Sequence, residues 1–310
     1  MFDPCLSARP AIRRTTVTSP FVRRRRLAEE LRALREAKGM TAEALSQLIY
    51  HSRTKVSRLE NAHIRPDLAE VMKILDILDV TGEKWNEVVR IARDAAERGW
   101  WDSYGDAMGA RQRLYADVES GASTIREYNP TAMPGILQTP EFTWALVELT
   151  RAEGQLDYVP ERAIEARLHR QRAVLDPHGP HYEVILDEVV IRRLGVPPQV
   201  LRVQLRHLVA TVEAHPRVRV LVLPMDTRIE GTLLPAAGFT LFTFRDLADP
   251  PMALVNTVNT DLVHTESDDV ARYTRRYDHL RHAALSPIKS LALLAETADK
   301  IAENQAGARP

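Results

Sequence analysis

Residues 41–61 carry the sequence TAEALSQLIYHSRTKVSRLEN, which decides the fold of the first part of the chain. Thr41 can cap a short helix whose apolar residues recur on one face, because its hydroxyl can accept a hydrogen bond from the first turn. Ser52 can cap a second helix, Arg53–Glu60, in the same way. Two short helices joined by a turn of about three or four residues predict a helix-turn-helix.

Further helices flank this motif on both sides. Leucines recur from Leu27 at the i, i+4 and i+7 positions, and Gly39 follows as a typical helix stop. Asp67 begins a fourth helix with a capping-box pattern, and helical periodicity continues through 85–98. The first part of the chain is therefore predicted to be all-helical.

The exposed residues of the second helix of the motif suit contact with DNA. Such a helix enters the major groove and meets base edges with its first turn, where Arg53 and Lys55 stand. Thr54 can donate or accept a hydrogen bond, or place its methyl against thymine. Arg58 and Asn61 lie further along and are placed for phosphate or sugar contacts.

Two other sites are predicted to bind phosphate. Thr41 stands at the N-terminus of the preceding helix, where backbone N–H groups can hold an anion. Glu43 would be repelled there, so we assign it no contact. The basic run Arg23–Arg26, and Arg24 in particular, is expected to touch the DNA backbone.

The charge of the 310-residue chain is zero overall but unevenly distributed. Residues 1–66 contain 14 Lys and Arg against 6 Asp and Glu, so the remainder carries the opposite excess of eight. A basic head on an acidic body suggests that the head meets a polyanion. A solvated basic tail is the alternative interpretation.

Cysteine content and hydropathy indicate a cytoplasmic protein, located on the nucleoid when it is bound to DNA. Cys5 is the single cysteine, so no internal disulfide can form. The N-terminus has no apolar run typical of a signal peptide, and no segment approaches the roughly 18 apolar residues of a membrane span.

The second part of the chain predicts a mixed α and β domain. Helical patterns occupy 111–128, 139–149, 161–175, 198–214, 267–285 and 287–303, and strand patterns occupy 182–186, 218–223, 239–244 and 253–258.

The first part resembles the λ Cro/repressor-type (XRE) helix-turn-helix family. The residues that carry the resemblance are Leu31 to Gly39, Ala44 to Ser46, Lys55 to Asn61, and Arg65 with Pro66. The resemblance implies a five-helix domain that reads operators. It also implies an architectural salt bridge between an arginine of the first helix, Arg35, and the glutamate that closes the third, Glu60.

Two positions depart from the family pattern. Tyr50 stands in the turn and Ala62 follows Glu60-Asn61, where the family often has glycine. Because a residue with a Cβ is disfavoured at positive φ, we expect the local turn to be reshaped or shifted by one residue.

The second part resembles a group of bacterial regulators in which an XRE domain is joined to an antitoxin-like domain. The matching stretches are 99–101, 119–128, 134–139, 167–171, 186–188, 204–208, 272–273 and 284–286. The resemblance covers Trp100 to about Ala302 and implies a transcriptional regulator, often paired with a small partner protein.

Together these observations predict a multidomain chain in which an all-α helix-turn-helix domain precedes a larger α+β domain. We expect a flexible basic arm at 1–20, the DNA-binding domain at 21–82, a helical connector at 83–99, a regulatory and dimerisation domain at 100–303, and a disordered tail at 304–310. The predicted function is that of a homodimeric regulator that binds double-stranded operator DNA. The alternative is an antitoxin or adaptor for a small protein encoded nearby, with DNA binding serving autoregulation.

We expect neither enzymatic activity nor a cofactor or metal. Asp187 and Glu188 could be catalytic carboxylates, but adjacent residues of a strand point to opposite faces, so helix capping and salt bridges with Arg192 and Arg193 are favoured. The histidine pairs lack the three or four ligands that zinc needs. Pro134–Thr139 is either a packed elbow or one wall of a ligand or partner groove, and the sequence leaves both open.

Overall fold

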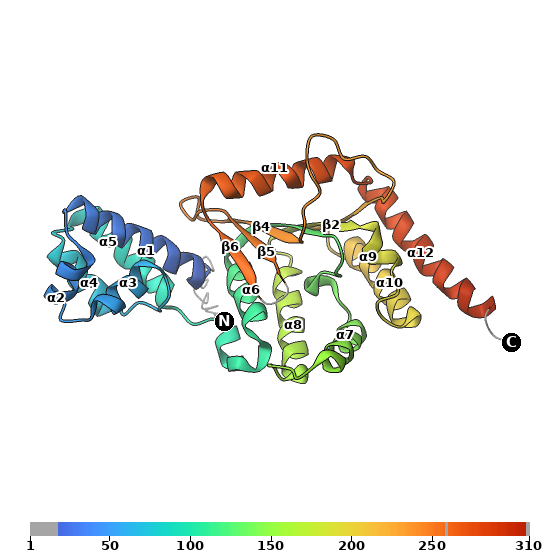
Figure 1. Cartoon of the computed structure of the whole chain (residues 1–310), viewed down its shortest axis with the longest axis horizontal. Coiled ribbons are helices and arrows are strands. Elements are labelled where there is room, and N and C mark those ends of the chain that lie inside the picture. Colours follow the sequence, from blue (N-terminus) through green and yellow to red (C-terminus); the bar gives the residue numbers. More distant parts are fainter. Residues whose placement is uncertain (1–17, 258–259, 308–310) are drawn as a thin grey trace, which may run out of the picture.

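The computed structural model describes residues 18–257 and 260–307, which form two domains. Figure 1 shows a small helical domain at one end of the molecule and a larger domain built around a sheet at the other. The two-domain arrangement, all-α followed by mixed α and β, agrees with the predicted fold class. Within the described residues, no helix is long and apolar enough to cross a membrane.

The helical domain contains five helices around one core. They are α1 (Pro20–Ala37), α2 (Ala42–Leu48), α3 (Arg53–Glu60), α4 (Leu68–Ile77) and α5 (Gly82–Ala96). Thr41, Ser52 and Asp67 cap α2, α3 and α4 by accepting a hydrogen bond from the backbone N–H three residues further on. The caps therefore fix where the helices of the motif begin.

The segment 83–99, expected as a helical connector, is an integral part of this domain. Most of it is α5, whose Val88, Ile91 and Ala92 are fully buried in the same cluster as Leu31 of α1. Burial of this apolar face makes α5 part of the helical core.

The larger domain contains one six-stranded sheet. Its strands are β1 (Ala122–Asn129), β2 (His181–Asp187), β3 (Val218–Leu223), β4 (Phe239–Phe244), β5 (Met252–Asn256) and β6 (Asp261–His264), arranged in the order β3-β2-β1-β4-β5-β6. β1, β2 and β3 are parallel, whereas β4, β5 and β6 are antiparallel to their neighbours.

Helices cover both faces of the sheet. Successive side chains of a strand point to opposite faces, and here both sets include apolar residues that must be buried. In β3, Val220 faces one core and Leu221 the other. α11 (Ser267–Ala283) covers the second face, along the top of Figure 1. The first face packs against α6 (Ala110–Gly121), α7 (Pro140–Glu153), α8 (Pro160–Val174), α9 (Glu188–Arg192), α10 (Pro198–Ala214), α12 (Pro287–Gly307) and the short 3₁₀ turn η2 (Gly135–Leu137).

The predicted helix over 111–128 is wrong in its second half. α6 ends at Gly121, and residues 122–129 form β1, the strand between β2 and β4. The carboxyl of Glu127 on β1 accepts a hydrogen bond 2.5 Å from the hydroxyl of Tyr182 on β2. A contact across 55 residues of sequence overrides local propensity here.

The chain ends also differ from expectation. Residues 1–17 of the predicted arm lie outside the described residues, and Ser19 and Pro20 already cap and begin α1. At the other end α12 continues to Gly307, so part of the predicted tail at 304–310 is helical. Trp101 is buried in the 3₁₀ segment η1 (Trp100–Met108), while Trp100 stacks on His169 of α8, which anchors the start of the second domain.

Candidate nucleic-acid interface

α3 presents a buried side to the helical domain and a polar side to solvent. Val56 and Leu59 are buried in the domain core. Arg53, Thr54 and Arg58 are exposed, and the side chain of Arg53 retains 75% of its accessible surface. The amphipathic pattern that the sequence predicted therefore leaves the expected contact residues on the outer side of the helix.

A buried ion pair holds α3 against α1. Nε of Arg35 donates to Oε1 of Glu60 at 2.7 Å, and Nη2 donates to Oε2 at 2.9 Å. The third nitrogen, Nη1, donates to the carbonyl of Met40 at 2.8 Å. The hydrogen bonds from Arg35 to the Glu60 carboxylate raise the pKa of Arg35. This bidentate contact fixes the end of α3 by geometry as well as by charge.

The turns of the motif keep the left-handed backbone that the family's glycines provide. Tyr50 has φ 59° and Ala62 has φ 58°, so the expectation of a reshaped or shifted turn is wrong. Two L-residues adopt the disfavoured conformation instead, at a cost of about 1–2 kcal/mol each. The ring of Tyr50 also receives the ammonium of Lys73, 4.7 Å from its centroid.

Three predicted contact residues have partners within the protein. The ammonium of Lys55 forms an ion pair with Glu70 of α4, which partly neutralises it. Asn61 donates to the Ser57 carbonyl at 2.7 Å and accepts from Nη2 of Arg32 at 2.9 Å. Thr41 is occupied as the cap of α2. If the three residues touch DNA, each must either break its contact within the protein or bind DNA while keeping it.

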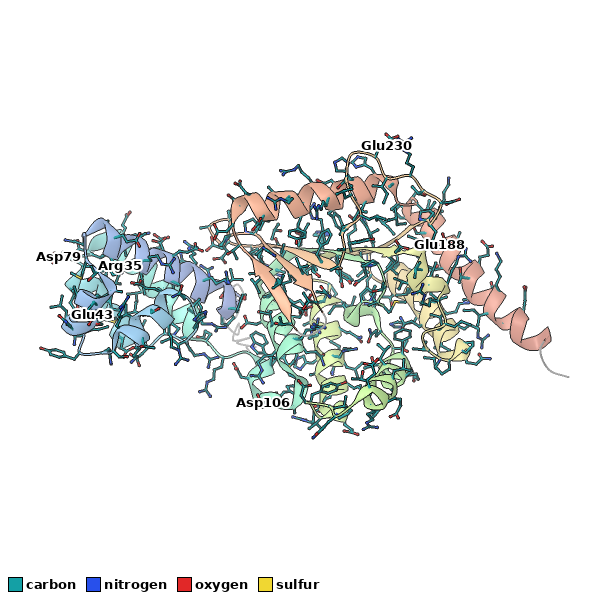
Figure 2. All side chains as sticks on the ribbon, in the orientation of Figure 1. Arg35, Glu43, Asp79, Asp106, Glu188 and Glu230 are labelled. Atoms are coloured by element: carbon teal, nitrogen blue, oxygen red, sulfur yellow. The ribbon has the colours of Figure 1, made fainter. Side chains whose placement is uncertain are left out.

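Arg53 and Arg58 are the predicted cations with the greatest freedom. Within residues 18–257 and 260–307, Arg58 makes no ion pair, and Arg53 approaches only Glu43, with 4.0 Å between Nε and Oε2. Figure 2 shows Glu43 at the outer end of the helical domain, away from the sheet. The neighbouring Arg53 is therefore on a surface that the second domain leaves open.

Arg24 is not positioned as predicted. Its guanidinium donates to Asp117 of α6 at 3.3 Å, and its side chain is only 16% exposed. Arg23 and Arg26 likewise donate to Asp246, in the loop after β4, at 2.9 and 3.2 Å. The basic run joins the helical domain to the acidic second domain, so it is not free to hold phosphate.

The sequence contained a signal for this contact that we interpreted differently. The acidic excess of the second domain is the electrostatic complement of the basic head, and Asp117, Asp246 and Asp249 are the groups that realise it. Gly121 supports the same docking, because a Cβ there would lie 2.5 Å from the backbone nitrogen of Ser19.

Two family models match the chain. A model described as a helix-turn-helix domain matches residues 26–88, and a model described as a domain of unknown function (DUF5753) matches residues 112–296, more than half of the chain. Neither the curated proteins nor the solved structures include a match. The first match confirms the predicted helix-turn-helix and supports a DNA-binding regulator.

Proposed function

We propose that this chain, which belongs to the family defined by the domain of unknown function DUF5753, is a transcriptional regulator that reads operator DNA with α3. The observation that carries the proposal is that exposed arginines stand on a helix that is held rigidly in place. Arg53 and Arg58 stand on the open side of a helix whose other side is fixed by a core and by the Arg35–Glu60 ion pair. Rigid elements place side chains more accurately than loops do, which base readout requires.

Arg53 is assigned the main base contact. It lies in the first turn of α3, the part of a recognition helix that meets base edges. A guanidinium can donate two hydrogen bonds at once, one to O6 and one to N7 of guanine. Arg58 lies one turn further on and is assigned a phosphate contact.

We propose that the protein binds DNA as a homodimer. One helix-turn-helix buries too little surface for tight operator binding, whereas two-fold pairing reads two half-sites about 34–36 Å apart. The second domain supplies the helical surface on which two copies can pair.

Selection of binding sites from random double-stranded DNA, followed by fluorescence anisotropy, tests the proposal. Arg53→Ala should weaken operator binding by about 1–3 kcal/mol and relax the preference at one base position. Arg58→Ala should weaken binding to all DNA sequences alike. It should also reduce the slope of log K against log salt concentration by about 0.9. Arg275→Ala is the matched control, because it removes an exposed arginine from α11 in the second domain. Operator binding by Arg53→Ala that equals wild type contradicts the assignment.

A second candidate function is that of an antitoxin or adaptor that captures a small protein. The segment between β3 and β4 favours it, because Met225, Leu233 and Leu234 are exposed there. Clustered exposed apolar residues are typical of protein-binding surfaces. Co-purification with the product of a neighbouring short reading frame, lost in Leu233→Ser/Leu234→Ser, would support this role; retention of the partner by that variant argues against it.

We further propose that the adjacent carboxylates of the second domain, Asp187 and Glu188, have no catalytic role. Asp187 caps α9 by accepting a hydrogen bond from the Val189 backbone. Glu188 pairs with Arg192 and accepts from the Met225 backbone at 2.9 Å. Both carboxylates thus have structural partners that account for them.

A further inference from the structure

The second domain contains a cavity of about 190 Å³ between the sheet and the helices of its first face. α6 and α8 form two walls, β1 and β2 form the floor, and the segment from Gly135 to Gln138 closes one side. An engineered cavity of about 150 Å³ accepts benzene, so this space fits a molecule slightly larger than a single aromatic ring. The elbow Pro134–Thr139, left open by the sequence, is one wall of this cavity.

Arg167 of α8 brings an uncompensated positive charge to this cavity. Its Nη1 donates to the amide oxygen of Gln138, but its Nε is shielded from solvent without a hydrogen-bond partner among the described residues. In the same described ranges it makes no ion pair. Burial, and after it the charge of Arg170, lowers the pKa of Arg167 to about 10, which still leaves a cation at neutral pH.

The neighbouring Arg170 shows what a compensated arginine looks like in this environment. Its Nε and Nη2 donate to the two carboxylate oxygens of Glu119 at 2.9 and 2.6 Å. Burying a charge is costly unless an opposite charge and hydrogen bonds accompany it. Arg170 meets both conditions, whereas Arg167, one turn away on the same helix, donates hydrogen bonds to Gln138 and Thr143 but has no carboxylate partner among the described residues.

The cavity also presents acceptors that can take a further hydrogen bond. Gln112 of α6 commits its Nε2 to the carbonyls of Met108 and Ala163, at 3.3 and 3.1 Å, while its buried Oε1 has no partner among the described residues. The buried carboxyl of Glu127 receives only neutral donors, the hydroxyl of Tyr182 and the amide of Asn129. A complementary molecule therefore carries an anionic group and also an N–H or O–H donor.

We propose that this cavity binds a small carboxylic acid bearing a hydroxyl or amino group, and that its carboxylate pairs with Arg167. The ligand supplies the anion that the chain does not, and its donor reaches Gln112 or Glu127. The assignment explains why the half-buried Arg167 is left without a carboxylate partner in a domain in which Arg170 has a bidentate one.

The position of α6 gives the ligand a route to DNA binding, a step that rests on the proposed function. Gln112, Tyr115 and Glu119 of α6 line the cavity. On the same helix, Asp117 accepts hydrogen bonds from the Ser19 hydroxyl at 2.8 Å and from Nη2 of Arg24 at 3.3 Å, both at the start of the helical domain. A ligand that favours one position of α6 therefore shifts how the two domains dock.

Thermal unfolding of the full-length protein tests the binding step without DNA. The probes are acetate, lactate, benzoate, 4-hydroxybenzoate, 4-aminobenzoate and phenylalanine, each beside its primary amide, which lacks the carboxylate. At about 100 times its Kd, an acid that fits should raise Tm by roughly 5–10 °C, and its amide should not. Arg167→Gln should abolish the shift, whereas Arg172→Gln, an exposed arginine on the same helix, should retain it.

A second variant keeps the test decisive if Arg167→Gln does not fold. Arg167→Lys keeps the cation but loses the planar fork, so the Kd of the bound acid should rise at least about tenfold. The binding proposal is overturned if no acid stabilises the protein more than its amide, or if the shift survives in both Arg167 variants. Operator affinity measured with the bound acid should change by about 5–150-fold. An unchanged affinity overturns the regulatory step alone, and absence of any operator binding counts against the proposed function instead.

Discussion

Replacement of Arg35 by methionine tests how α3 is held in place. The substitution leaves the Glu60 carboxylate, whose side chain is 6% exposed, without its two donors and leaves the Met40 carbonyl without its partner. Removing one member of a buried ion pair costs about 3–5 kcal/mol, because the remaining charge stays uncompensated. That loss is a large part of the roughly 5–15 kcal/mol that stabilises a typical domain.

Urea unfolding of the full chain, followed by far-ultraviolet circular dichroism, measures the effect. Since the slope is typically about 1–3 kcal/mol per molar urea, the transition of the helical domain should move by roughly 2 M. The double variant Arg35→Met/Glu60→Leu should recover most of the loss, because an apolar pair of similar volume has no charge to bury. A loss below about 1 kcal/mol in Arg35→Met, or a double variant as unstable as the single one, would refute this reasoning.

Three further predictions follow from single residues. Ala62→Gly should stabilise the helical domain by about 0.5–1 kcal/mol in urea unfolding, because relief of the left-handed backbone exceeds the entropy that glycine adds to the unfolded chain; an unchanged or lower midpoint contradicts this. Burial raises the pKa of Glu127, so the stability that its protonated form contributes is present below the unfolded pKa and is lost as pH rises through the folded value. Glu127→Gln should therefore gain stability relative to wild type as pH rises above 4.5, the usual pKa of glutamate, by at most about 1.4 kcal/mol per pH unit, and a difference that is flat with pH counts against it. Glu43→Gln should tighten binding to all DNA sequences several-fold at low salt, because it removes an anion beside Arg53, and the gain should disappear at high salt.

The helical domain could be predicted well because its signals are local. Thr41, Ser52 and Asp67 each act on a backbone N–H three residues away, so reading the sequence was enough to place the starts of α2, α3 and α4. The boundaries of α10, β3 and β4 likewise follow from runs of apolar residues with one clear periodicity.

Several of the missed features depend on partners elsewhere in the sequence. β1 is stabilised by pairing with β2 and β4 on its two sides. Its own sequence contains charged residues and therefore does not show the pattern of a central strand. The sequence predicts that Arg24 contacts DNA, but in the structure Arg24 donates its hydrogen bond to Asp117, 93 residues away. Lys55 forms an ion pair with Glu70, a residue that local patterns identify only as part of the start of a helix. Long-range electrostatic pairing of this kind is invisible to periodicity.

Cleavage of DNA from a reagent attached to α3 tests the central claim most directly. A chain with Cys5→Ser and Thr54→Cys would carry an iron chelate in the first turn of α3, and Cys5→Ser with Arg275→Cys would carry it on α11 as the control. The account predicts that the α3 reagent cuts a selected operator at two clusters with the strand offset of the major groove, about 10–10.5 base pairs or a multiple apart. The control reagent should leave these positions intact. Cleavage that is stronger from α11, or absent from α3 while the operator remains bound, would contradict the placement of α3 in the groove.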